Sequence, residues 1–137
     1  MRLQSATFLF IGLLSAFFAL APVSQAIADI PKTLSVKIEP AGADGETRFY
    51  NVSATIRHAD TGWDHYCNRF EVLDAATGRL LGERVLAHPH EDEQPFTRML
   101  YRMPVPPGVT RVRVRAHDSV HGYEPEGIEL DLPVERG

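Results

Sequence analysis

The feature of this 137-residue chain that most limits its fold is a regular alternation of apolar and polar side chains in short segments. In the segment 110–117, for example, Val112, Val114 and Ala116 alternate with arginines. Successive side chains of a strand point to opposite faces, so such a segment forms a strand with one buried face. The chain beyond residue 28 has no clear helical period, and the pattern therefore predicts an all-β domain.

Turn residues separate seven segments of this kind. The predicted strands cover residues 33–39, 47–58, 65–74, 80–87, 96–103 and 110–117, and a last strand contains Ile128, Leu130 and Leu132. Turns are predicted at PAGADG (40–45), AATG (75–78) and PVPPG (104–108). Seven short strands with this spacing predict an antiparallel sandwich of the immunoglobulin or fibronectin type III kind.

The first 28 residues are typical of an export signal. Arg2 gives a basic start, an apolar stretch follows over 8–21, and the small residues Ala26 and Ala28 fit cleavage after either of them. We therefore predict a signal peptide over 1–28. The protein is then periplasmic or secreted, and no membrane span is expected after the signal is removed.

The remaining residues, 29–137, have the length of one ordinary domain. The net charge of −4 argues against nucleic acid as a partner. Cys67 is the single cysteine, so an internal disulfide is excluded and a buried thiol, an intermolecular bridge or a metal ligand remains open. Because Cys67 alternates with Tyr66, which is in phase with Phe70, its side chain is predicted to point away from the core.

All six histidines lie beside three of the predicted loops. In an antiparallel sandwich, alternate loops lie at the same end, so these three loops are predicted to meet. Imidazole is the commonest protein ligand for transition metals. The three pairs are His58 and His65, His88 and His90, and His117 and His121.

His88 and His90 form the sharpest local pattern, because residues two apart in an extended segment point to the same side. Pro89 stiffens this pair. Neutral imidazoles with nearby carboxylates, of which Asp64 and Glu91 are weaker candidates, suit zinc or copper(II). We therefore predict a divalent copper or zinc ion at this end. The predicted ligands, in order, are His88, His90, His58, His117, His65 and His121.

Other functions are open. Trp63 and Tyr123 are of the residue types that anchor protein interfaces, so the loops also fit a module that contacts another envelope protein without a metal. The histidines can alternatively report acid pH through protonation. The sequence contains no nucleophile elbow, phosphate-binding loop or HExxH motif, and we do not expect an enzyme.

The arginines of the segment 110–117 are predicted to have a structural role. In the expected sandwich, this strand lies between the third and the last strands. Their outward acidic side chains, Glu71, Glu129 and Asp131, would then face the arginines as opposite-charge pairs across the sheet.

The three histidine-bearing runs are HADTGWDHY (58–66), HPHEDEQPFTR (88–98) and HDSVHGY (117–123). Together they resemble a group of small exported bacterial proteins of unassigned role. At the level of the fold, the strand pattern resembles fibronectin type III modules. This resemblance implies a β-sandwich and carries no activity with it, because that fold supports many functions.

Overall fold

The computed structural model describes residues 30–134, and this part of the chain contains strands and turns but no helix. The predicted signal peptide over 1–28 therefore lies outside the described residues. Within the described part, no helix is long and apolar enough to cross a membrane. The strands are β1 (Lys32–Asp44), β2 (Thr47–Arg57), β3 (Cys67–Asp74), β4 (Leu80–Val85), β5 (Phe96–Val105), β6 (Arg111–Asp118), β7 (Gly122–Tyr123) and β8 (Ile128–Asp131).

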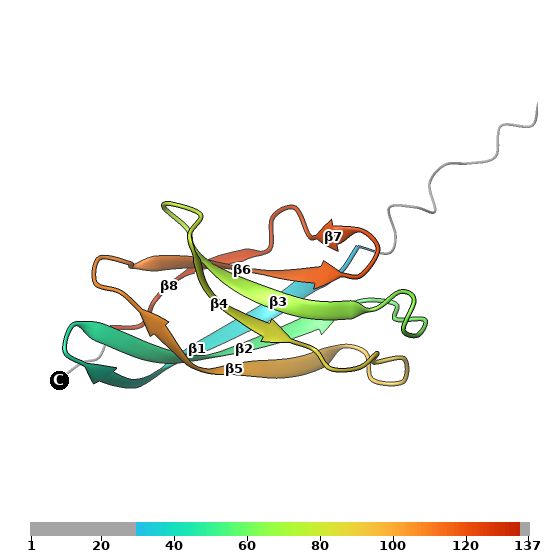
Figure 1. Ribbon diagram of the computed structural model, residues 1–137, viewed down its shortest axis with the longest axis horizontal. Coiled ribbons are helices and arrows are strands. Elements are labelled where there is room, and N and C mark those ends of the chain that lie inside the picture. The colour runs from blue at the N-terminus through green and yellow to red at the C-terminus, as the bar shows by residue number, and fades with distance from the viewer. Residues whose placement is uncertain (1–29, 135–137) are drawn as a thin grey trace, which may run out of the picture.

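The strands form two antiparallel sheets that pack face to face (Figure 1). One sheet has the order β1-β2-β5, and the other has the order β4-β3-β6-β7, with β8 also paired to β6. The predicted all-β antiparallel class is confirmed. The strand count differs, because the described residues also contain the two-residue strand β7 between the sixth and the last predicted strands.

The core lies between the sheets and follows the predicted alternation. On β2, Tyr50, Val52, Ala54 and Ile56 are at most 2% exposed. They face the inward side chains of the opposite sheet, among them Phe70, Val72, Val112, Val114 and Ala116. Burial of this apolar surface stabilises the fold and fixes which face of each strand points inward.

The predicted turn at 40–45 is wrong for most of its length, because β1 continues to Asp44. A register shift between Pro40 and Ala43 keeps β1 paired with β2. Pro40 is tolerated there because β1 is an edge strand, where the missing N–H group need not bond to a neighbour. The chain turns only after Asp44, at Gly45 and Glu46.

The predicted orientation of Cys67 is also wrong. Its side chain is fully buried in the core. The register of β3 against β6 shifts between Cys67 and Arg69, which oppose the consecutive residues Asp118 and His117. One extra residue in β3 forms a bulge that reverses the phase of the strand, so Cys67 and Phe70 both point inward although they are three apart.

The outward arginines of β6 pair as predicted. Arg115 Nε lies 2.6 Å from Glu71 Oε1 on β3. Arg111 Nη1 lies 2.8 Å from Asp131 on β8, and Arg113 pairs with Glu129 on the same strand. These contacts tie β6 to both of its neighbours on the outer face of the sheet.

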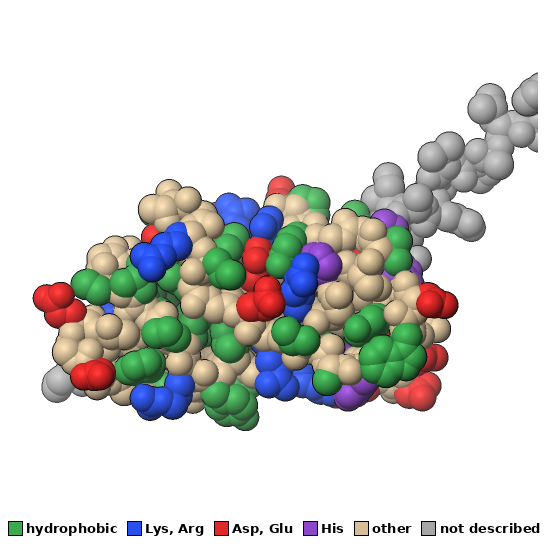
Figure 2. All heavy atoms as spheres, in the orientation of Figure 1, with side chains coloured by type: hydrophobic (Ala, Val, Ile, Leu, Met, Phe, Trp, Pro, Cys, Tyr) green, Lys and Arg blue, Asp and Glu red, His purple; other side chains and the backbone are tan. Residues whose placement is uncertain are grey.

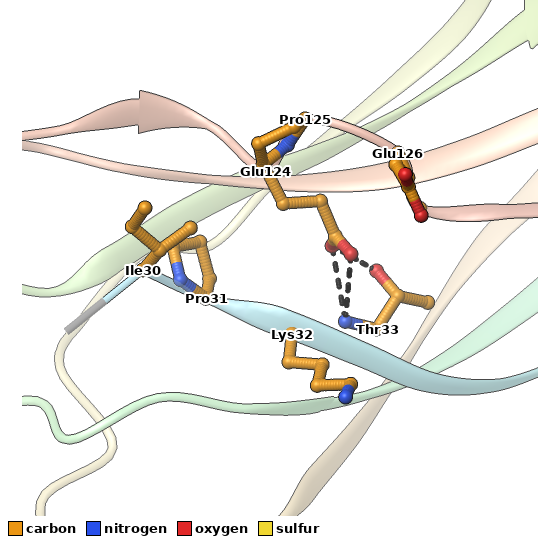
Figure 3. A pocket seen from close by; sticks show the side chains of 8 residues that line it. Ile30, Pro31, Lys32, Thr33, Glu124, Pro125 and Glu126 are labelled. Atoms are coloured by element: carbon orange, nitrogen blue, oxygen red, sulfur yellow. Dashed lines mark hydrogen bonds between the residues drawn. The ribbon is translucent and has the colours of Figure 1, made fainter. Parts of the chain in front are cut away.

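Glu124 joins the two sheets (Figure 3). Its carboxylate accepts hydrogen bonds from the N–H group of Thr33 (3.0 Å) and the hydroxyl of Thr33 (2.5 Å) on β1. It also accepts the N–H group of Ala116 (2.9 Å) on β6. A surface pocket of about 390 Å³ beside this contact is lined by residues 30–33 and 124–127. Because Glu124 has these partners, we assign it a structural role.

Candidate metal centre

The loops β2–β3, β4–β5 and β6–β7 lie at one end of the sandwich, on the right in Figure 1. Histidine and acidic side chains gather at this end in Figure 2. All six histidines belong to these loops or to the strand residues next to them. The end is not uniform, however, because the histidines divide into a cluster of three, a pair and a single residue.

Three imidazoles surround one carboxylate oxygen, Oδ2 of Asp118. His58 Nε2 lies 3.3 Å from it, His65 Nε2 lies 3.5 Å from it, and His121 Nδ1 lies 3.1 Å from it. The side chains of Asp118 and His58 are completely buried, and those of His65 and His121 are 15% and 31% exposed. The cluster therefore opens to solvent on the side of His65 and His121. The ligand atoms of His58, His65 and Asp118 all lie within 4.8 Å of one another.

The strand ends place these residues. His58 directly follows β2 in phase with Ile56, and Asp118 is the last residue of β6, in phase with Ala116. Both side chains thus continue an inward-facing row. A tight turn returns the chain so that His65 lies beside Asp118, and in this turn the N–H group of His65 donates to the carbonyl of Gly62 (3.2 Å).

Asp118 also shapes the turn that carries His121. Its Oδ1 accepts the backbone N–H groups of Val120 (2.8 Å) and His121. Burial by itself raises the pKa of Asp118, whereas these two hydrogen bonds lower it. The imidazoles of His121 and His65 lower it further, and the net pKa lies below its usual range. Asp118 is therefore a buried anion at neutral pH, which requires positive charge nearby.

Asp60 orients His58 from the opposite side. Its Oδ1 lies 2.6 Å from His58 Nδ1 and accepts the N–H group of Cys67 (3.0 Å). Its Oδ2 accepts the N–H group of His90 (2.7 Å). Because an ionised carboxylate only accepts, Nδ1 of His58 carries the proton in this contact and Nε2 faces Asp118. This is the arrangement in which an outer carboxylate fixes the tautomer of a metal-ligating histidine.

His88 and His90 form a separate pair. Their ring centroids are 4.6 Å apart, and the ring of His90 stacks on Phe96 at 4.1 Å. Nδ1 of His90 lies 3.7 Å from Asp60 Oδ2, so Asp60 stands between the pair and His58. The structure therefore places His88 and His90 next to the cluster around Asp118 but not in it.

His117 lies apart from both groups, on the outer face of β6. Its Nδ1 lies 2.6 Å from Asn68 Oδ1, and Arg69 donates to its Nε2 at 3.0 Å. Burial, followed by the charge of Arg69, lowers the pKa of His117. Both ring nitrogens have protein partners, so the structure does not bring His117 together with the other predicted ligands.

Asp118, the carboxylate of the cluster, and Asp60, which orients His58, are two of the acidic residues that lie near the histidines in the sequence, but Asp64 and Glu91 were the carboxylate ligands predicted. Both of those residues are exposed. A signal for Asp118 exists in the sequence, because it continues the buried row of Val114 and Ala116. An acidic residue in such a row predicts a buried carboxylate with a partner.

Comparisons with known proteins find similar chains whose descriptions name no activity. No family model matches the chain. A protein of Halomicrobium mukohataei described as "Putative lipoprotein" is 37% identical over 98 residues, which cover 72% of this chain and 45% of that protein. The chain thus spans about half the length of this curated relative. A crystal structure of a hypothetical protein from Pyrococcus horikoshii OT3 is 13% identical, covers 74% of this chain and 89% of its own, and has a TM-score of 0.41.

Proposed function

We propose that this protein is an exported envelope protein that binds one divalent transition-metal ion, zinc or copper, at a centre formed by His58, His65, His121 and Asp118. The observation that carries the proposal is the approach of three imidazole nitrogens to 3.1–3.5 Å from one buried carboxylate oxygen. Storage, delivery and sensing of the ion all fit such a centre. We do not propose an enzymatic activity.

The distances fit the edges of a small coordination shell. In a tetrahedral zinc site, ligand atoms lie about 2.0–2.1 Å from the ion, which places them about 3.3–3.4 Å from one another. The separations of His58, His65 and His121 from Asp118 Oδ2 are 3.3, 3.5 and 3.1 Å. An ion could therefore be accommodated with small side-chain movements.

The electrostatics also favour a cation. Nδ1 of His58 lies 2.6 Å from Asp60 Oδ1, and Nε2 of the same ring lies 3.3 Å from Asp118 Oδ2. Two buried carboxylates therefore lie on either side of this ring, and they attract positive charge. A metal ion supplies that charge, and imidazole and carboxylate together suit zinc or copper(II).

Export and the type of sandwich belong to the same proposal. Export is supported by the signal-like residues 1–28 and by the description of the Halomicrobium relative as "Putative lipoprotein". We also infer a fibronectin type III-like sandwich. In the constant-type immunoglobulin fold the fourth strand lies beside the fifth, whereas here β4 pairs with β3.

The test is metal binding by the purified mature protein. We expect one tightly bound zinc or copper ion per chain, measured by native mass spectrometry and by competition with a coloured chelator. The His65→Ala and His121→Ala variants remove partly exposed ligands, so the fold should persist while affinity falls by at least about tenfold. His117→Ala is the matched control and should bind like the wild type.

Two results would overturn the proposal. One is a wild-type protein, purified folded, that takes up neither zinc nor copper. The other is uptake that remains equally tight when His65 and His121 are both replaced by alanine. Circular dichroism of each variant establishes that it is folded, so a loss of binding can be assigned to the missing ligand.

A protein-interaction module is the second candidate, and one observation favours it. Trp63 is 66% exposed at the histidine end, with its ring packed edge-on against Tyr66 at 5.6 Å. Tyr123, the other predicted contact residue, instead packs against the guanidinium groups of Arg69 and Arg115. This candidate predicts no metal uptake and loss of partner binding in Trp63→Ala.

A further inference from the structure

A second group of potential ligands lies outside the proposed centre. A surface pocket of about 510 Å³ is lined by Trp63 and by residues 88–93. These residues include His88, His90 and three acidic side chains, and none of them belongs to the cluster around Asp118. The pocket is at the same end of the molecule, where Figure 2 shows acidic side chains beside histidines.

His90 is the unusual residue of this pocket. Its side chain is only 1% exposed, and neither ring nitrogen has a hydrogen-bond partner among the described residues. Leaving a buried polar group without a partner destabilises the folded state. The ring is held in place by stacking on Phe96. A buried imidazole that is fixed in position without a partner is what an absent ligand would leave behind.

One ring nitrogen of His90 lies beside a buried carboxylate. Nδ1 lies on the side of Asp60, at 3.7 Å from its Oδ2. An imidazole that is fixed in position beside a carboxylate is an arrangement that transition-metal sites use.

His88 supplies a second nitrogen next to His90. The centroids of the two rings are 4.6 Å apart. Nδ1 of His88 lies 2.8 Å from the carbonyl of Pro89, which can only accept, so this nitrogen carries the proton and Nε2 has the lone pair. The exposed carboxylates of Glu91 and Asp92 add negative charge around the pocket, which attracts cations. Glu93 is instead paired with Arg98 at 3.1 Å.

We propose that His88 and His90 form a second, outer site for a divalent transition-metal ion, separated from the inner centre by Asp60. The inference rests on the proposed metal-binding function. The outer site is the weaker of the two, because it offers two imidazoles and solvent-exposed acids instead of three imidazoles and a buried carboxylate. Copper(II) is the favoured ion, since it binds nitrogen ligands more strongly than the other divalent first-row metals.

The number of copper ions bound by the wild type and four variants tests this assignment. Each protein is titrated with copper(II) and analysed by native mass spectrometry, with electron paramagnetic resonance to detect nitrogen ligands. We expect two ions in the wild type, one in His88→Ala and one in the double variant His65→Ala/His121→Ala. The triple variant, which combines these three replacements, should bind none. His117→Ala, which removes a histidine outside both groups, should still bind two. His88 is exposed, so its replacement should leave the fold unchanged.

The outcomes separate the two proposals. If the wild type and His88→Ala both bind one ion and the double variant binds none, the outer site is wrong and the inner centre stands. If the double variant keeps the tightest ion and His88→Ala loses it, the inner centre is wrong. A wild type that binds no copper overturns both.

Discussion

Asp60 touches no proposed metal ion, yet it positions His58, and this makes it the residue with the largest indirect effect on the inner centre. In Asp60→Asn, one carboxylate oxygen is replaced by an amide that donates instead of accepting. Either the contact with His58 Nδ1 or the one with the His90 N–H group is then lost. We expect zinc affinity to fall by about 10–100-fold while the ligands remain, measured by chelator competition.

The matched control for this change is Asp64→Asn. Asp64 is an exposed acidic residue of the same loop. Its replacement removes one negative charge from this loop and leaves the contacts of Asp60 in place, so it measures the effect of charge alone. Equal loss of affinity in the two variants would contradict a positioning role for Asp60.

The thiol of Cys67 is expected to be inert in the folded protein. Burial, followed by the charge of Asp60, raises the pKa of Cys67 to about 12. Only about one molecule in ten thousand then carries the thiolate at pH 8, and no path from solvent leads to it. Iodoacetamide should label the protein in urea within minutes and leave the native protein unlabelled. Rapid labelling of the native protein would contradict the buried position of Cys67.

At the scale of single residues, the sequence predicted whether a side chain points into the core or away from it wherever a strand stays regular. His58 and Asp118 continue the inward rows of β2 and β6, so their burial follows from the alternation. Cys67 does not follow it, because the bulge in β3 adds a residue that no turn signal marks. The role of Asp60 was beyond reach for another reason. It depends on a local contact with His58 together with a contact to His90, which lies 30 residues further along the chain.

At the scale of strands, Gly127 is required for β8 to reach β6. It has φ of +69°, and a Cβ atom there would lie 2.2 Å from the carbonyl oxygen of Val114. Gly127→Ala should destabilise the protein by more than the about 1–3 kcal/mol that a left-handed conformation costs by itself. Urea unfolding measures the change.

Gly45→Ala is the matched control, since Gly45 also has a positive φ (+59°) but no atom within 4 Å of the added Cβ. The difference between the two variants therefore isolates the clash with β6 from the strain of the backbone. If both variants lose the same stability, the close approach of Gly127 to Val114 is not what matters.

Glu124 should prove to be the main polar link between the sheets. In Glu124→Gln, an amide replaces a carboxylate oxygen, so a donor would face the N–H groups of Thr33 and Ala116. We expect a loss of about 2 kcal/mol in the free energy of unfolding. Glu126→Gln changes an exposed acid in the same pocket and should alter stability by less than about 0.5 kcal/mol. A similar loss in both would refute the link.

The sequence predicted which strands are neighbours better than it predicted the residues at which the strands end. The arginine row on β6 was expected to meet acids on two neighbouring strands, and the pairs with Glu71 and Asp131 are present. The extension of β1 past Pro40 was not expected, because an edge strand tolerates a proline that a central strand would not. The position of the three histidine-bearing loops at one end could be predicted because alternate loops of an antiparallel sandwich lie at the same end.

At the scale of the whole molecule, metal binding should appear as thermal stability. A ligand that binds only the folded state at 100 times its dissociation constant contributes about 2.7 kcal/mol. For a domain of this size, that raises the unfolding temperature by on the order of 10 °C. Calorimetry with zinc should detect the rise, and EDTA should abolish it. His65→Ala/His121→Ala should give no comparable rise, and an equal rise in this variant would place the stabilising ion elsewhere.

The two described ends of the chain lie at opposite poles of the sandwich. Lys32 pairs with Arg57, next to His58, whereas Asp131 pairs with Arg111, at the far end of β6 from Asp118. A tether attached ahead of Ile30 should therefore hold the histidine-rich pole, where the ions are proposed to bind, against its support, and one attached after Val134 should turn that pole outward. Immobilised samples coupled through the two termini should accordingly differ in how fast a bulky chelator strips their ions.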